Sequence, residues 1–210
     1  MKKYEKLYDD VYNKIKHQIL DKQLFPGSHI VEERLAKEEG ISRAAVRLVL
    51  SRLQEDGLVT ITPHTGTFVI HPTRAEIKQL YDVRLQLEQG VANLAVENIT
   101  PEAIARMEAN YEAQQQLIDQ YSIKKYARLN RDFHWEIILA TQNKFYINFL
   151  EELYNISQVF LIFYDNSVNN SRSLETHGKI LQALHNRDKQ MLGEMLKLDA
   201  LSGIEELDTY

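Results

Sequence analysis

Apolar residues recur every three or four positions along the first third of the chain, which is the spacing of one helix face. Leu7, Val11 and Ile15 show this period. Gly40 is suited to end a helix, because glycine adopts left-handed backbone, and Ser42 is suited to cap the next one. Helices are predicted over residues 4–22, 31–39 and 42–56.

After Gly57 the apolar residues recur at every second position instead of every third or fourth, which is typical of strands. Residues 58–62 and 67–70 both alternate in this way, and the connection between them runs from Pro63 to Gly66. Gly66 can adopt the positive φ that a tight hairpin needs. Three helices followed by one hairpin predict a winged helix-turn-helix.

The helical period returns from Thr73 onward, and no alternating segment interrupts it. Thr100 and Pro101 form a cap and first-turn pair for one of these helices. Helices are predicted over residues 74–97, 101–119, 122–141, 144–164, 171–186 and 188–207. The predicted fold class is therefore mainly α, with the winged helix-turn-helix in residues 1–72 and an antiparallel all-α bundle of about six helices in residues 73–210.

Charge is distributed unevenly between these two predicted domains. The 210-residue chain has a formal net charge of −5, but residues 1–72 hold 11 Lys/Arg against 10 Asp/Glu, and residues 73–210 hold 14 against 20. A nearly neutral module can bind DNA if its cations share one face. The first domain is therefore compatible with a nucleic-acid partner, and the acidity belongs to the second.

Composition excludes several classes of protein. Hydrophobic residues make up 44% of the chain, enough for a core, and the absence of cysteine excludes disulfides and thiolate metal sites. No apolar run approaches the roughly 18 residues of a membrane span. No signal-peptide pattern follows the N-terminal Met1-Lys2-Lys3. We expect a cytoplasmic protein with no membrane partner.

The third predicted helix carries the candidate DNA-reading residues. A helix that enters the major groove needs polar and cationic side chains at its N-terminal end, and Arg43 and Arg47 share one face there. Arginine binds guanine bidentately, Ser42 can reach a phosphate, and the small Ala44 lets the backbone approach the bases. A solvated helix face is the alternative. The wing candidates are His64, Thr65 and Gly66.

These segments resemble the GntR family of bacterial regulators. The resemblance rests on Leu24-Phe25-Pro26-Gly27, Glu33-Arg34-Leu35-Ala36, the run from Ile41 to Arg47, the run from Leu53 to Val59, and Gly66-Thr67-Phe68-Val69. It implies double-stranded DNA as partner, with contacts from Ser42, Arg43, Arg47 and the wing. Glu33 stands where many members have an arginine, so Arg34 is an adjacent candidate, and Ala44-Ala45 replace a frequent Thr-Pro.

The second domain resembles the FadR-type effector domain of that family. The resemblance rests on the segments 83–88, 130–134 and 175–184. It implies a homodimer with a small-molecule effector, often a carboxylic acid, and a divalent metal in the bundle. The implied metal ligands are Asn130, His134, His177 and Asp199, with Asn130 in place of the usual Asp and Asp199 in place of a His.

Spacing is compatible with this metal site, because Asn130 and His134 lie four residues apart on one helix face. Nitrogen and oxygen ligands suit zinc, nickel or manganese. The alternative is that His134 and His177 are ordinary polar residues of a bundle. Arg84 could bind an effector carboxylate bidentately, or it could pair with Glu88 one turn away, an interpretation that we favour slightly.

The leading functional hypothesis is a ligand-responsive transcription regulator that binds a palindromic operator as a dimer. The resemblance favours a repressor. One alternative is a metal-sensing regulator, in which the metal itself is the effector. A metal-dependent hydrolase is a further alternative, but no general base and no partnered nucleophile is found, so we expect a protein that is not an enzyme.

Overall fold

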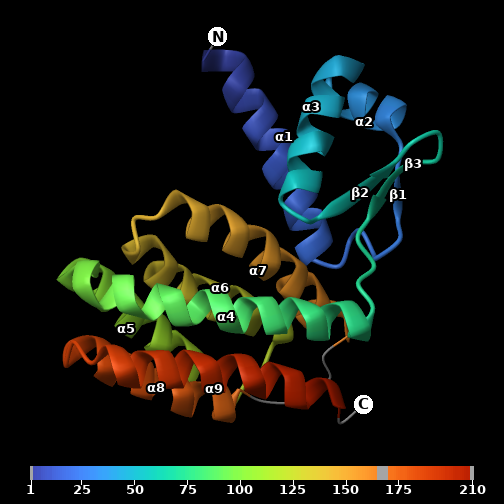
Figure 1. The fold of residues 1–210 in the computed structure, drawn as a ribbon. Helices are drawn as coiled ribbons and strands as arrows, with labels where there is room; N and C mark the ends of the chain where they lie inside the picture. Colours follow the sequence, from blue (N-terminus) through green and yellow to red (C-terminus); the bar gives the residue numbers. More distant parts are fainter. Residues whose placement is uncertain (1, 165–169, 209–210) are drawn as a thin grey trace. The chain divides into compact units, whose positions relative to one another are not determined.

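The computed structural model describes residues 2–164 and 170–208, with side chains described over 6–164 and 170–202. The chain divides into two compact units, Met1–Pro72 and Thr73–Tyr210 (Figure 1).

The first unit is a winged helix-turn-helix, as its periodicity predicted. Its helices are α1 (Lys2–Leu20), α2 (Glu32–Glu39) and α3 (Arg43–Glu55). Helix α3 packs against both other helices and against the sheet. Ile15 and Ile19 of α1 and Leu50 and Leu53 of α3 are buried, and the two helices pack together. The buried face of α3 therefore fixes the orientation of its polar face.

The ends of α2 and α3 follow the predicted capping pattern. Gly40 adopts left-handed backbone with φ 64°, and it ends α2. The Ser42 hydroxyl accepts a hydrogen bond from the Ala45 amide at 3.1 Å and caps α3. Because the caps of the two helices are only two residues apart, the N-terminal turn of α3 lies in a defined place beside α2.

Three strands form an antiparallel sheet in the order β1-β3-β2. The predicted hairpin consists of β2 (Val59–Thr62) and β3 (Gly66–Val69), and β1 (His29–Ile30) adds the third strand. The prediction of two strands was therefore incomplete. Two residues cannot display an alternating period, and β1 pairs with residues far along the chain, His29 with Phe68.

Two features favour glycine at Gly66, which lies next to the turn at the tip of the wing. Its φ of +124° is a conformation that side chains disfavour, and an added Cβ would lie 2.5 Å from His29 Nε2. We expect Gly66→Ala to lower the free energy of unfolding by about 1–3 kcal/mol, measured by denaturant titration. Gly27→Ala is the control, because Gly27 has φ +78° with nothing within 4 Å. Equal losses for both variants would contradict the contribution of His29.

The second unit is a helical bundle. Its helices are α4 (Arg74–Asn98), α5 (Pro101–Gln115), α6 (Ile123–Ala140), α7 (Lys144–Tyr164), α8 (Ser171–His185) and α9 (Lys189–Asp208). Helix α4 lies beside α9 and runs antiparallel to it, and it also packs against α6 and α7 (Figure 1). Helix α8 packs against α5 and α9. Among the described residues, no helix has both the length and the apolar character to cross a membrane.

Two helix boundaries in this unit are set by local hydrogen bonds. Thr73 and Glu76 form a capping box that begins α4, and the Thr100 hydroxyl caps α5. Helix α5 ends at Gln115, four residues before the predicted position. The Leu117 amide bonds to the Gln114 carbonyl at 3.1 Å, so the chain tightens into a turn there.

The bundle core is mostly apolar, but it also holds buried polar and charged residues. Phe133, Ile137 and Met107 are among its fully buried side chains. The buried polar and charged residues of this unit include Arg84, Glu88, Gln114, His134, Asn155, Ser157, Gln158, Ser173 and His177. Buried polar groups are costly unless they are partnered, so this concentration marks the candidate site.

Candidate metal centre and nucleic-acid interface

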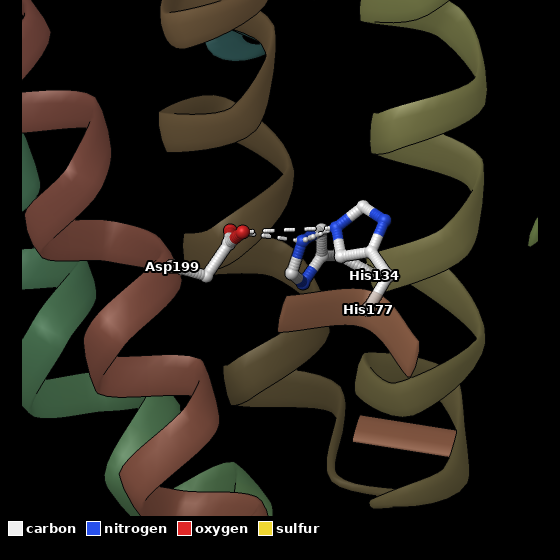
Figure 2. Close-up of side chains that lie close together, drawn as sticks. All are labelled: His134, His177 and Asp199. Atoms are coloured by element: carbon white, nitrogen blue, oxygen red, sulfur yellow. Dashed lines mark hydrogen bonds and ion pairs between the residues drawn. The ribbon is translucent and has the colours of Figure 1, made fainter. Parts of the chain in front are cut away.

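Three of the four predicted metal ligands converge in the bundle. His134 from α6, His177 from α8 and Asp199 from α9 point toward one another (Figure 2). The two Nε2 atoms are 3.1 Å apart, His134 Nε2 is 3.1 Å from Asp199 Oδ2, and His177 Nε2 is 3.7 Å from Asp199 Oδ1. Three helices that are distant in sequence thus bring two imidazoles and one carboxylate together.

The spacing of these donor atoms fits a divalent ion. Nitrogen and oxygen ligands lie about 2.0–2.2 Å from zinc, so neighbouring donors on one ion lie about 3.0–3.5 Å apart. Two of the three donor separations are 3.1 Å and lie within that range, and the third, at 3.7 Å, is slightly longer. Without sulfur in the set, the donors suit zinc, nickel or manganese.

Hydrogen bonding fixes which nitrogen of His177 faces the cluster. The Gln114 amide group donates to Asn110 Oδ1 at 2.7 Å, so its oxygen is left to face His177. His177 Nδ1 lies 2.9 Å from that oxygen and donates its proton to it. Nε2 therefore presents a lone pair toward His134 and Asp199, which is the arrangement of a metal-binding imidazole held by an outer partner.

The protonation states of the cluster are also those that a metal requires. Burial lowers the pKa of His177 to about 3, so its ring is neutral near pH 7. Burial alone would raise the pKa of Asp199, but the neighbouring His134 outweighs it and lowers that pKa to about 2. A neutral His177 imidazole and an ionised Asp199 carboxylate are the forms in which these two groups bind a metal ion.

Asn130, the fourth predicted ligand, lies on α6 one turn before His134. Its Oδ1 is buried and has no hydrogen-bond partner among the described residues. A buried acceptor without a partner is costly, and a cation would satisfy it. Asn130 stays a predicted fourth ligand, and its neutral amide is a weaker ligand than a carboxylate.

Arg84 and Glu88 form a buried ion pair on α4, the interpretation favoured for Arg84. The Arg84 guanidinium donates to Glu88 Oε1 at 2.9 Å and to Ser157 Oγ at 3.3 Å. The Tyr154 hydroxyl donates to the same Glu88 oxygen at 2.9 Å. Because the Tyr154 and His134 ring centroids are 6.0 Å apart, this network adjoins the metal-ligand cluster.

Trp135 is the single tryptophan of the chain and directly follows His134. Its half-buried ring packs against the bundle core, and the Arg131 guanidinium lies 4.8 Å from the ring centroid. The indole is therefore held in place on the same helix as two of the candidate ligands.

The predicted DNA-reading arginines are exposed at the start of α3, and glutamates of α2 pair with them. Arg43 Nη2 lies 2.5 Å from Glu33 Oε1, and Arg47 Nε lies 2.9 Å from Glu32 Oε2. Ser42 and Ala44 are exposed beside them. Arg34 instead pairs with Glu38 one turn along its own helix, at 2.6 Å.

A groove joins this helix to the wing. It is lined by Glu32, Arg47, Leu50 and the segment 61–67. His64, Thr65 and Gly66 of the wing thus lie on one surface with Arg47. The sequence motifs did not indicate that Glu32 and Glu33 pair with the arginines of α3, or that Gln114 bonds to His177. In each case the two partners lie on different helices.

Comparison with known proteins identifies both units. The model for bacterial regulatory proteins of the gntR family matches residues 7–69, and the FCD domain matches residues 79–198. The transcriptional regulator McbR of Escherichia coli is 26% identical over 90% of this chain and 86% of its own length. The solved structure of E. coli McbR/YncC aligns with TM-score 0.82 at 25% identity, covering 97% of each chain.

Two further relatives are of the same kind. The transcriptional regulator YdhC of Bacillus subtilis is 25% identical over 87% of this chain and 83% of its own length. The transcriptional repressor RspR of E. coli is 24% identical over 85% of this chain and 78% of its own length. Both matched domains and these relatives belong to transcription regulators rather than enzymes. The chain therefore belongs to the GntR family and is a DNA-binding transcription regulator with an FCD domain.

Proposed function

We propose that this regulator responds to a small ligand at a divalent metal held in its bundle. The observation that carries the proposal is the buried convergence of His134, His177 and Asp199, whose ligand atoms all lie within 4.8 Å of one another. Asn130 supplies the fourth position. Three helices contribute ligands, so occupancy of the site stabilises one arrangement of the bundle over others.

The charge around the cluster supports a carboxylic-acid effector that binds together with the metal. Asp199 and Glu88 carry two negative charges against the one positive charge of Arg84, so a carboxylate entering alone would be repelled. When bound, a divalent ion supplies the missing positive charge and an open coordination position. Arg84 then orients the effector from the side of Tyr154.

The effector is tested by operator binding of metal-loaded and chelated protein in the presence of small carboxylic acids. We expect an acid that binds to change operator affinity only in the metal-loaded protein. Coupling between two sites of one protein is typically about 1–3 kcal/mol, which corresponds to about a 5- to 150-fold change. Acids that act equally on chelated protein would contradict the role of the metal.

A metal-sensing regulator is the second candidate function. The observation that favours it is the engagement of Arg84 by Glu88, which leaves that guanidinium neutralised before any effector arrives. Chelation without any organic acid distinguishes the two. A change in operator affinity on chelation alone supports the metal as signal, and no change supports a metal that only holds the effector site.

On DNA we propose contacts from the start of α3 and from the wing. The residues are Arg34, Ser42, Arg43, Ala44, Arg47, His64, Thr65 and Gly66. A single winged helix contacts few phosphates, so two copies on a palindromic operator supply the affinity. We propose repression as the mode of action, because the relative RspR is a transcriptional repressor.

Exposed phenylalanines on α7 support a homodimer formed by the FCD domain. Phe145 and Phe149 are one helical turn apart and are 60% and 59% exposed, and Val83 of the neighbouring α4 is 50% exposed. We expect Phe145→Glu with Phe149→Glu to weaken dimerisation by about 100-fold or more, since buried aromatic anchors dominate interfaces. Light scattering coupled to size-exclusion chromatography measures the mass.

Ile118→Glu is the control for this prediction, because Ile118 is a similarly exposed apolar residue at 51% in the turn after α5. It is expected to leave the dimer intact. A dissociation constant for the double phenylalanine variant equal to that of wild type, measured over a dilution series, would place the interface elsewhere.

A further inference from the structure

The two glutamates that begin α2 face the two arginines that begin α3. We propose that Glu33 is a specificity-determining residue. Its carboxylate holds one side of the Arg43 guanidinium, so that Arg43 reaches base edges with its remaining N–H donors but adds little to the attraction for phosphates. The inference rests on the proposed base contact of Arg43 and adds to it a competitor inside the protein.

The fold keeps this competitor in place. Glu32 and Glu33 are the first two residues of α2, where the helix dipole favours negative charge. Arg43 is the first residue of α3, and its partner Glu33 is 2.5 Å away, while Arg47 one turn later meets Glu32 at 2.9 Å. Each of these two arginines on the reading face therefore has an anion of its own.

This pairing lowers the affinity of the protein for an unrelated duplex. Sequence-independent affinity comes from cations that neutralise phosphates. An arginine already neutralised by glutamate adds little to it, and the carboxylate itself is repelled by the phosphate backbone. A correctly placed guanine still gains affinity, because its O6 and N7 accept two hydrogen bonds from a guanidinium whose five N–H donors also leave one for Glu33. Glu33 thus lowers wrong-site affinity more than right-site affinity, which raises specificity.

Glu33 is better suited than Glu32 for testing this idea. The Glu33 side chain is 76% exposed, so its charge can be changed without disturbing the core. The Glu32 side chain is 34% exposed and lines the groove shared with the wing, where it also serves packing. A neutral isostere at Glu33 therefore isolates the electrostatic contribution.

The experiment measures binding of the full-length Glu33→Gln protein to two duplexes by fluorescence anisotropy. One duplex is the sequence that wild-type protein enriches most strongly by in vitro selection, and the other is an unrelated mixed-sequence duplex. We expect affinity for the unrelated duplex to rise about fivefold, the upper range for one exposed ion pair. Affinity for the selected duplex should rise less than about twofold. For the unrelated duplex, the slope of log affinity against log salt concentration should steepen by about 0.9, because Arg43 then contacts one more phosphate.

Glu38→Gln is the matched control, because it removes the same charge from the same helix but from the partner of Arg34. Glu38→Gln should change neither the ratio of the two affinities nor the slope against salt concentration to this extent. Glu33→Asp should behave like wild type, because it keeps the negative charge. In an Arg43→Ala background, Glu33→Gln should raise the affinity for both duplexes equally, since only the repulsion between the carboxylate and the phosphates is then lost.

Three results would overturn the inference. They are an unchanged affinity for the unrelated duplex, an equal rise on both duplexes, and an equal effect of Glu38→Gln. Weakened binding of the selected duplex by Glu33→Gln would mean that Glu33 contacts a base itself, which also overturns it. Intact binding of the selected duplex by Arg43→Ala alone would instead refute the proposed base contact of Arg43, so the two failures are distinguishable.

Discussion

Replacing Arg43 and Arg47 together with alanine is expected to abolish sequence-specific DNA binding while the protein stays folded. Both side chains are largely exposed, at 61% and 70%, so their removal leaves no cavity in the core. A good bidentate contact to a base contributes about 1–3 kcal/mol of discrimination. Two such contacts correspond to a loss of at least about 30-fold in affinity for the selected duplex.

Anisotropy titration measures the affinity, and thermal unfolding checks that the double variant is folded. The control is Arg106→Ala with Arg128→Ala, which removes the same two charges from α5 and α6 of the bundle. That variant should bind the selected duplex nearly as well as wild type. Unchanged affinity in the Arg43 and Arg47 variant would rule out the start of α3 as the reading surface.

The second large effect is expected at the metal centre. Protein purified without chelator should carry about one divalent ion per chain, and His134→Ala with His177→Ala should retain less than about a tenth of it. Loss of an outer partner alone typically costs about 10–100-fold in metal affinity, and loss of two direct ligands costs more. Elemental analysis by mass spectrometry measures the content.

The same variants should lose the stabilisation that added metal gives. An ion present at about 100 times its dissociation constant raises the free energy of unfolding by about 2.7 kcal/mol, which a thermal shift detects. His185→Ala is the control, because His185 is an exposed histidine of α8 that bonds to Glu108 outside the cluster. Asp199→Asn preserves side-chain shape and tests the site without a cavity.

Wild-type metal content in the double histidine variant would show that the proposed ligands are wrong. If that variant unfolds, the metal content of Asp199→Asn is the decisive measurement. Retention of full metal affinity by folded Asp199→Asn would remove the carboxylate from the proposed ligand set.

The elements that could be predicted from sequence are those whose signal is local. Val46, Leu50 and Leu53 repeat at helical spacing and are buried in α3, and the caps at Gly40 and Ser42 are single-residue signals. Strand β1 was missed because His29 and Ile30 become a strand only by pairing with β3. Its formation depends on long-range contact, which no local period records.

The residues of the candidate site were also only partly predictable from the sequence. Resemblance identified His134, His177 and Asp199, and their convergence follows from helices whose periods are clear in the sequence. Gln114, which orients His177, stands in a run of three glutamines that carries no motif. Glu33 stands out in the sequence only as a departure from a family pattern, since its partner Arg43 lies on the next helix.

The fluorescence of Trp135 can report on the candidate site without an added label. Indole emission depends on the polarity and charge around the ring, and this ring lies beside the Arg131 guanidinium and next in sequence to His134. With a single tryptophan and no cysteine in the chain, every change in tryptophan fluorescence reports on this one place, and one introduced cysteine could carry an acceptor dye. Metal loading and effector binding can thus be followed in real time, in unlabelled protein, while the DNA is titrated in the same cuvette.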